Sequence, residues 1–166
     1  MSSEGIIVQV NVSPGGLPKR AIAEGYIAPL GLEGDSFAHP EFHGGPKKAV
    51  LIVASEVVDE LKARGYPVFY GALGENLTTR GLDVRDLRIG DRLRAGGALI
   101  EITQTRVPCS ALDVYGESLK REIWDSQVKA GDHRSPRWGM SGFKASVVEP
   151  GPVRAGDIIS VVAKLA

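Results

Sequence analysis

The only cysteine of the chain, Cys109, lies in a segment whose composition suits a ligand-binding site. The segment reads Thr103-Gln104-Thr105-Arg106-Val107-Pro108-Cys109-Ser110 and follows an apolar run that predicts a β-strand, a place where functional residues often lie. Pro108 fixes the chain direction before the cysteine, and Arg106 could favour a thiolate and bind an anionic cofactor group bidentately. A lone cysteine is more often a small buried side chain than a ligand, so both interpretations of Cys109 stay open here.

A second segment gathers acidic, histidine and glycine residues in one irregular stretch, Gly31-Leu32-Glu33-Gly34-Asp35-Ser36-Phe37-Ala38-His39-Pro40-Glu41-Phe42-His43-Gly44-Gly45. Glycines allow a backbone to pass close to a ligand, while Asp and His supply hydrogen bonds or metal ligation. A structured loop with satisfied polar groups explains the same residues equally well. His39 and His43 have the spacing of two zinc ligands on a helix, but Pro40 opposes a helix there, so zinc is not the favoured interpretation.

A third segment, Gly71-Ala72-Leu73-Gly74-Glu75-Asn76-Leu77-Thr78-Thr79, places a polar pair between glycine and an extended run. The amide of Asn76 offers donors and acceptors that suit the edges of a heterocycle such as a pterin. The residues alone favour the alternative, an ordinary strand entry in which Asn76 satisfies turn backbone.

Two basic clusters, Pro46-Lys47-Lys48 and His133-Arg134-Ser135-Pro136-Arg137, could bind phosphate, although such runs are more often solvated surface. We expect His133 to be an exposed loop histidine. The sequence contains neither a Gly-x-x-x-x-Gly-Lys-Ser/Thr run nor a Gly-x-Gly-x-x-Gly run, so the usual signals for a nucleotide are missing.

Length and composition predict one globular domain over residues 1–166. The chain is 43% hydrophobic and 24% charged, and its formal net charge is zero, which opposes nucleic acid or anionic lipid as the main partner. No apolar stretch approaches the roughly 18 residues of a membrane span, and the start lacks a signal-peptide pattern, so we expect a cytoplasmic protein without membrane attachment. One cysteine forms neither an internal disulfide nor a zinc site of paired cysteines.

Short β-rich runs separated by Gly, Pro and Asp predict a mainly β, barrel-like fold with a few helices. The expected strands are Ile6-Val12, Ala49-Ala54, Asp91-Ala95, Ala98-Thr103, Lys144-Val148 and Asp157-Val162. Ser55 is predicted to cap a helix over Glu56-Arg64 that stops at Gly65, and a second helix is predicted from about Ser118 to Ala130, ending at Gly131. Gly-Asp pairs at 90–91 and 156–157 are interpreted as repeated turn chemistry that begins a strand.

Four segments taken in order strongly resemble the MOSC family, named for the molybdenum cofactor sulfurase C-terminal domain. They are Gly31-Leu32-Glu33-Gly34-Asp35, His43-Gly44-Gly45 with Lys48-Ala49-Val50, Gly74-Glu75-Asn76-Leu77-Thr78, and Arg106-Val107-Pro108-Cys109. The resemblance implies a β-barrel-like single domain that binds molybdenum cofactor, with Cys109 as the molybdenum ligand; the family is also associated with pyridoxal phosphate binding. The residues that match the family's cofactor-binding segments are Gly44, Gly45, Glu75, Asn76, Thr78, Arg106 and Cys109.

The chain is similar to small stand-alone bacterial members of this family and to the mitochondrial amidoxime-reducing component. That similarity implies an oxidoreductase that reduces N-hydroxylated bases and related N-oxygenated compounds, with electrons from a separate electron-transfer protein or reductase. Asp35 or His43 would supply or relay the proton. Phe37 stands where some members have a histidine, so no such role is transferred to His39. We expect neither a sulfurase domain before this one nor an iron-sulfur domain after it, and a homodimer stays open.

Two other functions remain open. The protein could be a non-catalytic carrier that stores the cofactor or delivers sulfur through a Cys109 persulfide, or a binding module without cofactor in which Cys109 belongs to the core. Metal analysis distinguishes the binding module from the other two, and turnover with a reduced donor distinguishes the enzyme from the carrier.

Overall fold

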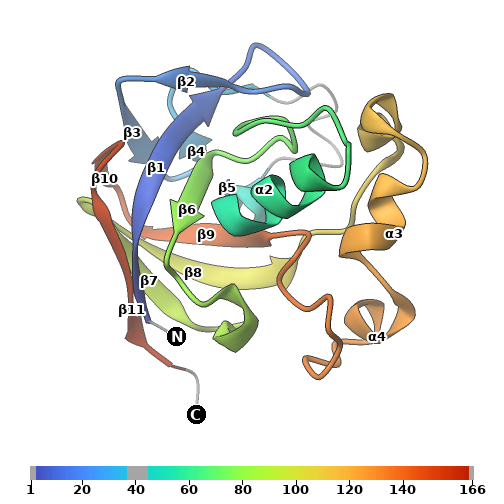
Figure 1. The fold of residues 1–166 in the computed structure, drawn as a ribbon. Helices are drawn as coiled ribbons and strands as arrows, with labels where there is room; N and C mark the ends of the chain where they lie inside the picture. Colours follow the sequence, from blue (N-terminus) through green and yellow to red (C-terminus); the bar gives the residue numbers. More distant parts are fainter. Residues whose placement is uncertain (1–2, 37–44, 165–166) are drawn as a thin grey trace.

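Seven strands close into a mixed barrel in the computed structural model, which describes residues 3–36 and 45–164 (Figure 1). Around the barrel the strands follow the order β1 (Glu4–Val12), β11 (Ile158–Ala163), β7 (Arg92–Ala95), β8 (Ala98–Thr105), β9 (Phe143–Glu149), β5 (Val50–Ala54) and β6 (Leu77–Arg80), which pairs again with β1. All these pairs are antiparallel except β5–β6, which is parallel. The expected mainly β, barrel-like fold is confirmed.

Four further strands lie beside the seven strands of the barrel. β2 (Arg20–Ile22) pairs with β1, and β10 (Gly151–Arg154), β3 (Glu24–Ala28) and β4 (Gly31–Leu32) form a separate antiparallel sheet. These four strands were not predicted from the sequence, whereas β6 directly follows Asn76, as the strand-entry interpretation of residues 71–79 expected. The four unpredicted strands have two to five residues each, too few for a clear alternation of apolar and polar side chains.

Strand β5 is buried on both faces because it separates two apolar clusters. Val50 and Ile52 belong to the core inside the barrel, whereas Leu51 and Val53 pack with α2 (Ser55–Ala63) and with residues of the later helices. Its continuous apolar sequence fits a strand covered on both sides, and α2 supplies the crossover that a parallel β5–β6 pair requires. β5 is thereby packed on both of its faces.

The six predicted strands are all present, with ends that differ by at most two residues from the expected ones. The Gly-Asp turns are confirmed as well. Gly90 and Gly156 both have a φ of 96°, and Asp91 and Asp157 each accept a hydrogen bond from the backbone N–H three residues earlier, at 2.8 and 2.9 Å. The two pairs thus begin β7 and β11 by the same local chemistry.

The helices differ from the predicted ones in two respects. Ser55 is the first residue of α2 and not its cap, because Ala54 occupies the N-cap position and makes no side-chain capping bond. The predicted helix over Ser118 to Ala130 is divided into α3 (Leu119–Ile123) and α4 (Ser126–Lys129). Asp125 causes the break, since its extended backbone and its carboxylate, which accepts from Val128 N at 2.8 Å, form the N-cap of a new helix.

Short 3₁₀ helices complete the described chain: η1 (Pro46–Lys48), η2 (Val84–Asp86) and η3 (Ser110–Tyr115). Within residues 3–36 and 45–164, no helix is long and apolar enough to cross a membrane.

Candidate functional site

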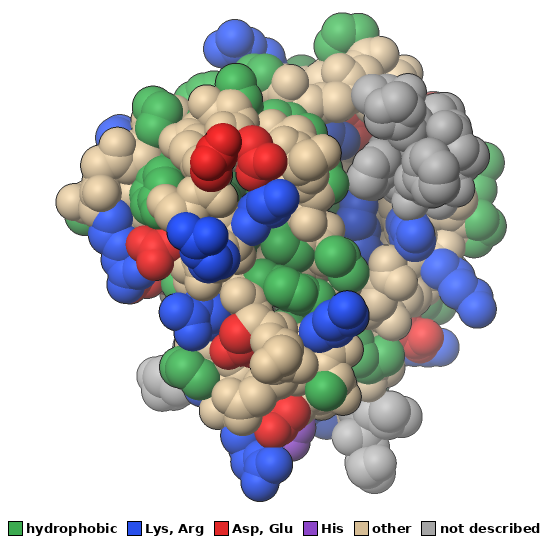
Figure 2. Space-filling model, turned by 90° about the vertical axis from the view of Figure 1, so that its right-hand side faces the viewer, with side chains coloured by type: hydrophobic (Ala, Val, Ile, Leu, Met, Phe, Trp, Pro, Cys, Tyr) green, Lys and Arg blue, Asp and Glu red, His purple; other side chains and the backbone are tan. Residues whose placement is uncertain are grey.

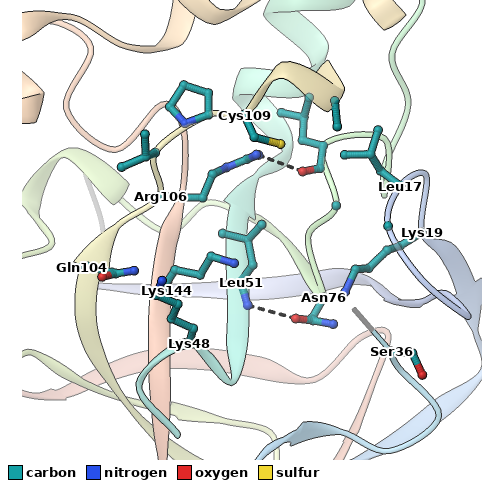
Figure 3. Close-up of a pocket in the computed structure, with 16 residues that line it drawn as sticks. Leu17, Lys19, Ser36, Lys48, Leu51, Asn76, Gln104, Arg106, Cys109 and Lys144 are labelled. Carbon is teal, nitrogen blue, oxygen red and sulfur yellow. Dashed lines mark hydrogen bonds between the residues drawn. The ribbon is translucent and has the colours of Figure 1, made fainter. Parts of the chain in front are cut away.

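A cavity of about 530 Å³ lies where β5, β8 and β9 meet the loops that contain residues 16–19, 73–76 and 106–111 (Figure 3). Its volume falls in the range of about 300–1,000 Å³ that is usual for small-molecule sites. Part of its wall is apolar, formed by Leu17, Leu51, Leu73, Val107, Pro108 and Ala111. The charged part consists of Lys19, Lys48, Arg106 and Lys144, so four cationic side chains share one cavity.

Cys109 lies in the cavity wall as a free, partly exposed thiol. It occupies the N-cap position of η3, with an extended backbone at φ −104° and ψ 169°. The helix that follows is anchored by fully buried Leu112 and by Tyr115, whose hydroxyl donates to Ala72 O at 2.7 Å. Cys109 is therefore held by a fixed backbone and remains accessible from the cavity.

Arg106 is buried beside Cys109 and hydrogen-bonded to the protein. Its Nε donates to Ser141 O at 3.0 Å and its Nη2 donates to Leu73 O at 2.8 Å. Burial lowers the pKa of Arg106, and the neighbouring Cys109 and Glu75 oppose that shift. The guanidinium thus joins two loops that line the cavity, and only part of its donor fork is left for a ligand.

The three lysines contribute most of the remaining charge. Figure 3 shows the Lys19 and Lys144 side chains directed into the cavity and Lys48 beside Gln104. Burial, followed by the charges of Arg106, Lys19 and Lys48, lowers the pKa of Lys144 to about 8. The face that Figure 2 presents has Lys and Arg side chains around an apolar area and others deep in an adjacent hollow.

Asp35 and Asn76 hold Lys19 in place. The Asp35 carboxylate accepts from Ser13 N at 2.9 Å, from Asn76 Nδ2 at 2.8 Å and from Lys19 Nζ in a buried ion pair. Asn76 also accepts from Leu51 N at 3.0 Å and donates to Asn11 O at 3.3 Å. Its amide is thus occupied by backbone, as the strand-entry interpretation expected.

Glu75 and Thr78 belong to a buried network behind the wall. Glu75 Oε2 accepts from Gly71 N at 3.0 Å and from Thr78 Oγ1 at 2.9 Å, while Oε1 is buried without a hydrogen bond. Burial raises the pKa of Glu75 despite these bonds. Gly71 in turn accepts from Lys19 N at 2.9 Å and has a φ of 98°, and a Cβ there would lie 2.2 Å from Lys19 O. Glu75 therefore fixes the loop against which the Lys19 backbone rests.

The family model of the MOSC domain matches residues 39–160, most of the chain. The chain belongs to the MOSC domain family. Protein YiiM of Escherichia coli is 31% identical over 147 residues, which are 84% of this chain and 59% of that protein, so the chain spans less than two thirds of its length. A protein of Gibberella moniliformis named Reductase is 29% identical over 82% of this chain, but the match covers only 23% of that protein.

A solved structure of YiiM from Geobacillus stearothermophilus superimposes on this MOSC domain with a TM-score of 0.71 at 27% identity. The superposition covers 96% of this chain and 75% of that one. The chain therefore has a fold already seen in a YiiM protein.

The predicted site residues of this MOSC domain fall into three groups. Asn76, Arg106 and Cys109 line the cavity. Asp35 does not line it but forms an ion pair with Lys19, which does. Glu75 and Thr78 are buried behind its wall, and Gly45 is exposed and is not among the lining residues. His39, His43 and Gly44 lie outside the described residues. His133 is exposed in a loop, as expected, with Nδ1 3.2 Å from Arg88 Nη2.

Lys19, Gln104 and Lys144 also line the cavity but were not predicted as site residues. Lys48 was predicted only as part of a basic cluster that could bind phosphate and of a segment that resembles the family. Gln104 on β8 pairs with Lys144 on β9. A register shift between Ile102 and Gln104 interrupts the regular alternation of side chains between the two faces of β8. The sequence signal for Gln104 and Lys144 would have been a polar side chain near the end of β8 and another near the start of β9. Within the described part of the chain, no group of three or more His, Cys, Asp or Glu side chains could hold a metal ion.

We expect Asp35→Ala to lower the free energy of unfolding by about 3–5 kcal/mol, because it leaves the Lys19 ammonium buried without its carboxylate. The double variant Asp35→Ala/Lys19→Met should regain most of that stability, since no unpaired charge remains. Urea unfolding of the four members of this cycle measures the coupling. The control is Asp86→Ala, whose side chain is 69% exposed. A single variant as stable as the wild type would contradict this role for Asp35.

We expect the pH dependence of stability to change in Glu75→Gln. Because burial raises the pKa of Glu75 in the folded chain, the native state binds more protons than the unfolded state above about pH 4.5. The contribution of Glu75 is therefore present at low pH and lost as the pH rises through the folded pKa. Urea unfolding between pH 5 and 8 should show the wild type losing stability relative to Glu75→Gln as the pH rises. The same substitution at exposed Glu117 is the control, and parallel profiles would refute the assignment.

Proposed function

We propose that this MOSC domain binds a molybdenum-pterin cofactor in its cavity, with Cys109 as the metal ligand. We further propose that it reduces N-hydroxylated bases and related N-oxygenated compounds with electrons from a separate donor. The observation that carries the proposal is that a fixed thiol and four cationic side chains share one cavity of ligand size. The Gibberella moniliformis relative named Reductase supports the oxidoreductase class.

The donor set of the cavity suits such a cofactor. A soft thiolate is a suitable ligand for molybdenum, and the cationic wall suits an anionic cofactor. Gln104 has no side-chain hydrogen bond among the described residues, so its amide is available to the edges of a heterocycle. Gln104 would therefore take the role that the sequence analysis gave to Asn76, whose amide is already bonded to backbone and to Asp35.

When bound, the cofactor supplies a metal that can exchange two electrons and accept an oxygen atom from nitrogen. The chain supplies the position and the electrostatics around it. Cys109 would hold the metal, and Arg106 would place positive charge beside the thiolate and keep the loops of Leu73 and Ser141 together. The apolar side chains of the wall exclude water from part of the cavity, which strengthens the interactions of the charged ones.

The proton source stays a prediction that names Asp35 or His43. Asp35 makes three hydrogen bonds and its side chain is only 3% exposed, which favours a positioning role for this carboxylate. Pyridoxal phosphate binding, a cytoplasmic location and a homodimer likewise stay predictions.

We expect Cys109→Ser to lose activity with the fold retained. Loss of a residue outside the metal's own ligands often costs about 10–100-fold, so loss of the ligand itself should lower kcat by more than about 100-fold. The exposed neighbour Ser110→Ala is the control. Turnover of an N-hydroxylated purine, circular dichroism and molybdenum content are measured together, because pterin contacts can retain cofactor after the ligand is lost. Full activity of the serine variant would disprove the ligand assignment.

We expect this chain to show no turnover with NADH or NADPH alone, and turnover with a reduced viologen. The sequence has no dinucleotide fingerprint, and one cysteine is too few for an iron-sulfur cluster, so two electrons must come from another molecule in each cycle. The assay uses protein from a host that makes the cofactor, with its molybdenum content measured. NADH-driven turnover by pure protein would contradict the proposal. Full molybdenum loading without turnover from any donor would instead support the carrier function.

A further inference from the structure

Lys144 presents an available ammonium to the cavity. The residue lies near the start of β9, and Figure 3 shows its side chain directed into the cavity, farther from the Cys109 thiol than the Arg106 guanidinium is. Its side chain is only partly exposed, and its Nζ makes no hydrogen bond or ion pair with residues 3–36 or 45–164. All three of its N–H groups can therefore contact a molecule that occupies the cavity.

The surroundings of Lys144 lower its affinity for a proton. Burial has the largest effect, and the charges of Arg106, Lys19 and Lys48 add to it, while Cys109 acts in the opposite direction. These groups approach from the loop after β8, the loop between β1 and β2, η1 and the start of η3. Together they lower the pKa of Lys144 to about 8. An acid with a pKa near the working pH can release and regain a proton in every catalytic cycle.

Three other candidates for an acid in this region are less suited. The Asp35 carboxylate accepts three hydrogen bonds, one of them within its ion pair with Lys19, and its side chain is only 3% exposed. Lys19 is held by the same pair. Arg106 is bonded to two backbone carbonyls, and a guanidinium stays protonated in proteins. Lys144 thus combines access to the cavity with N–H groups that are not already bonded.

Reduction of an N-hydroxylated base consumes protons as well as electrons. The N–O bond breaks, an N–H bond takes its place and the oxygen leaves as water, so each turnover uses two electrons and two protons. Under the proposed function, the two electrons come from the separate donor. Part of the cavity wall is apolar, and a positioned side chain delivers protons in such a site more effectively than bulk water.

We propose that Lys144 is a catalytic residue that donates a proton to the oxygen removed from the substrate nitrogen. The proposal rests on the proposed function, because it names the proton donor of that reaction. One N–H bond of the ammonium breaks as an O–H bond forms, and the neutral amine then regains a proton from water. The second proton of the turnover comes from solvent.

The first experiment follows the proton on Lys144 without any metal. The full chain, with ¹³C-labelled lysine, is made in a host that cannot make the cofactor, and the lysine Cε signals are recorded by NMR between pH 6 and 11. We expect one signal to titrate with a pKa of about 8 and to be missing from Lys144→Met. The control Lys129→Met, at an exposed lysine of α4, should leave that signal in place. A Lys144 signal that titrates at the ordinary lysine pKa of about 10.4 would overturn the proposal.

The second experiment separates the proton of Lys144 from its charge in protein loaded with molybdenum cofactor. Lys144→Met removes both, whereas Lys144→Arg keeps the charge on a guanidinium that does not release its proton. We expect both variants to lower kcat by about 100-fold or more. Lys144→Arg should retain the molybdenum content of the wild type, and Lys129→Met should retain its activity as well.

The pH profile of kcat provides a further measurement on the same proteins. Because the ammonium is the active form, wild-type kcat should fall as the pH rises through the pKa of Lys144. That fall is expected at or above about pH 8, since an anionic cofactor nearby raises the pKa of an ammonium. It should be absent from both Lys144 variants.

The outcomes distinguish this role from the proposed function. Wild-type kcat in Lys144→Arg, with the fold confirmed by circular dichroism, would show that the site needs a charge and not a proton, and would overturn the role of Lys144 alone. Absence of turnover by fully loaded wild-type protein with every donor would overturn the proposed function, and the role of Lys144 would fail with it.

Discussion

The side-chain amide of Asn76 is the interaction on which the architecture of the cavity depends. It accepts from Leu51 N on β5, donates to Asn11 O on β1 and donates to Asp35, and all of these bonds are buried or nearly so. β5 and β1 lie on either side of β6 in the barrel, and Asn76 directly precedes β6. One amide thereby joins three barrel segments and orients the carboxylate that holds Lys19. Few other side chains can accept and donate in this way, because the bonds require both halves of an amide.

The cavity concentrates positive charge at a cost that the rest of the fold offsets. Burial and mutual repulsion disfavour the charged forms of Arg106 and Lys144, as the lowered pKa values of both groups indicate. The barrel tolerates this arrangement because its apolar core is extensive and β5 is packed on both faces. A protein often keeps such unfavourable charges at a functional site, where a ligand removes the repulsion. The binding of an anion should accordingly stabilise the folded chain.

The sequence predicted the parts of this structure that depend on local chemistry. Apolar runs located six strands, the Gly-Asp pairs located two strand starts, and Gly65 and Gly131 ended helical segments with φ values of 99° and 81°. The prediction of one helix from about Ser118 to Ala130 was wrong because the side chain of Asp125 caps a new helix and so divides the segment into two. The short strands β2, β3 and β4 form mainly through pairing with distant segments, which local patterns do not encode.

The candidate site was predictable only in part, for a similar reason. Family resemblance located Asn76, Arg106 and Cys109, which do line the cavity, but it gave no information about how their polar atoms are used. Lys19 and Lys144 come from loops and strands 125 positions apart, and only the closed barrel brings them to one wall. Glu75 was assigned to cofactor binding from its place in the motif. Its carboxyl instead accepts hydrogen bonds from Gly71 N and Thr78 Oγ1. It thereby fixes the loop of Gly71, to which the backbone of the cavity residue Lys19 is hydrogen-bonded.

Arg106 matches the family's cofactor-binding segment, yet its side chain also has a structural role in the wall of the cavity. Its guanidinium donates to two backbone carbonyls from different loops, a geometry that the single ammonium of a lysine cannot reproduce. Substitution at Arg106 would therefore loosen the loops of Leu73 and Ser141 together with any effect on a bound anion. Loss of cofactor in such a variant would not show that the arginine touches the cofactor, because the same loss follows from a deformed wall. Lys144 has no such structural bonds among the described residues, so the two effects can be separated there.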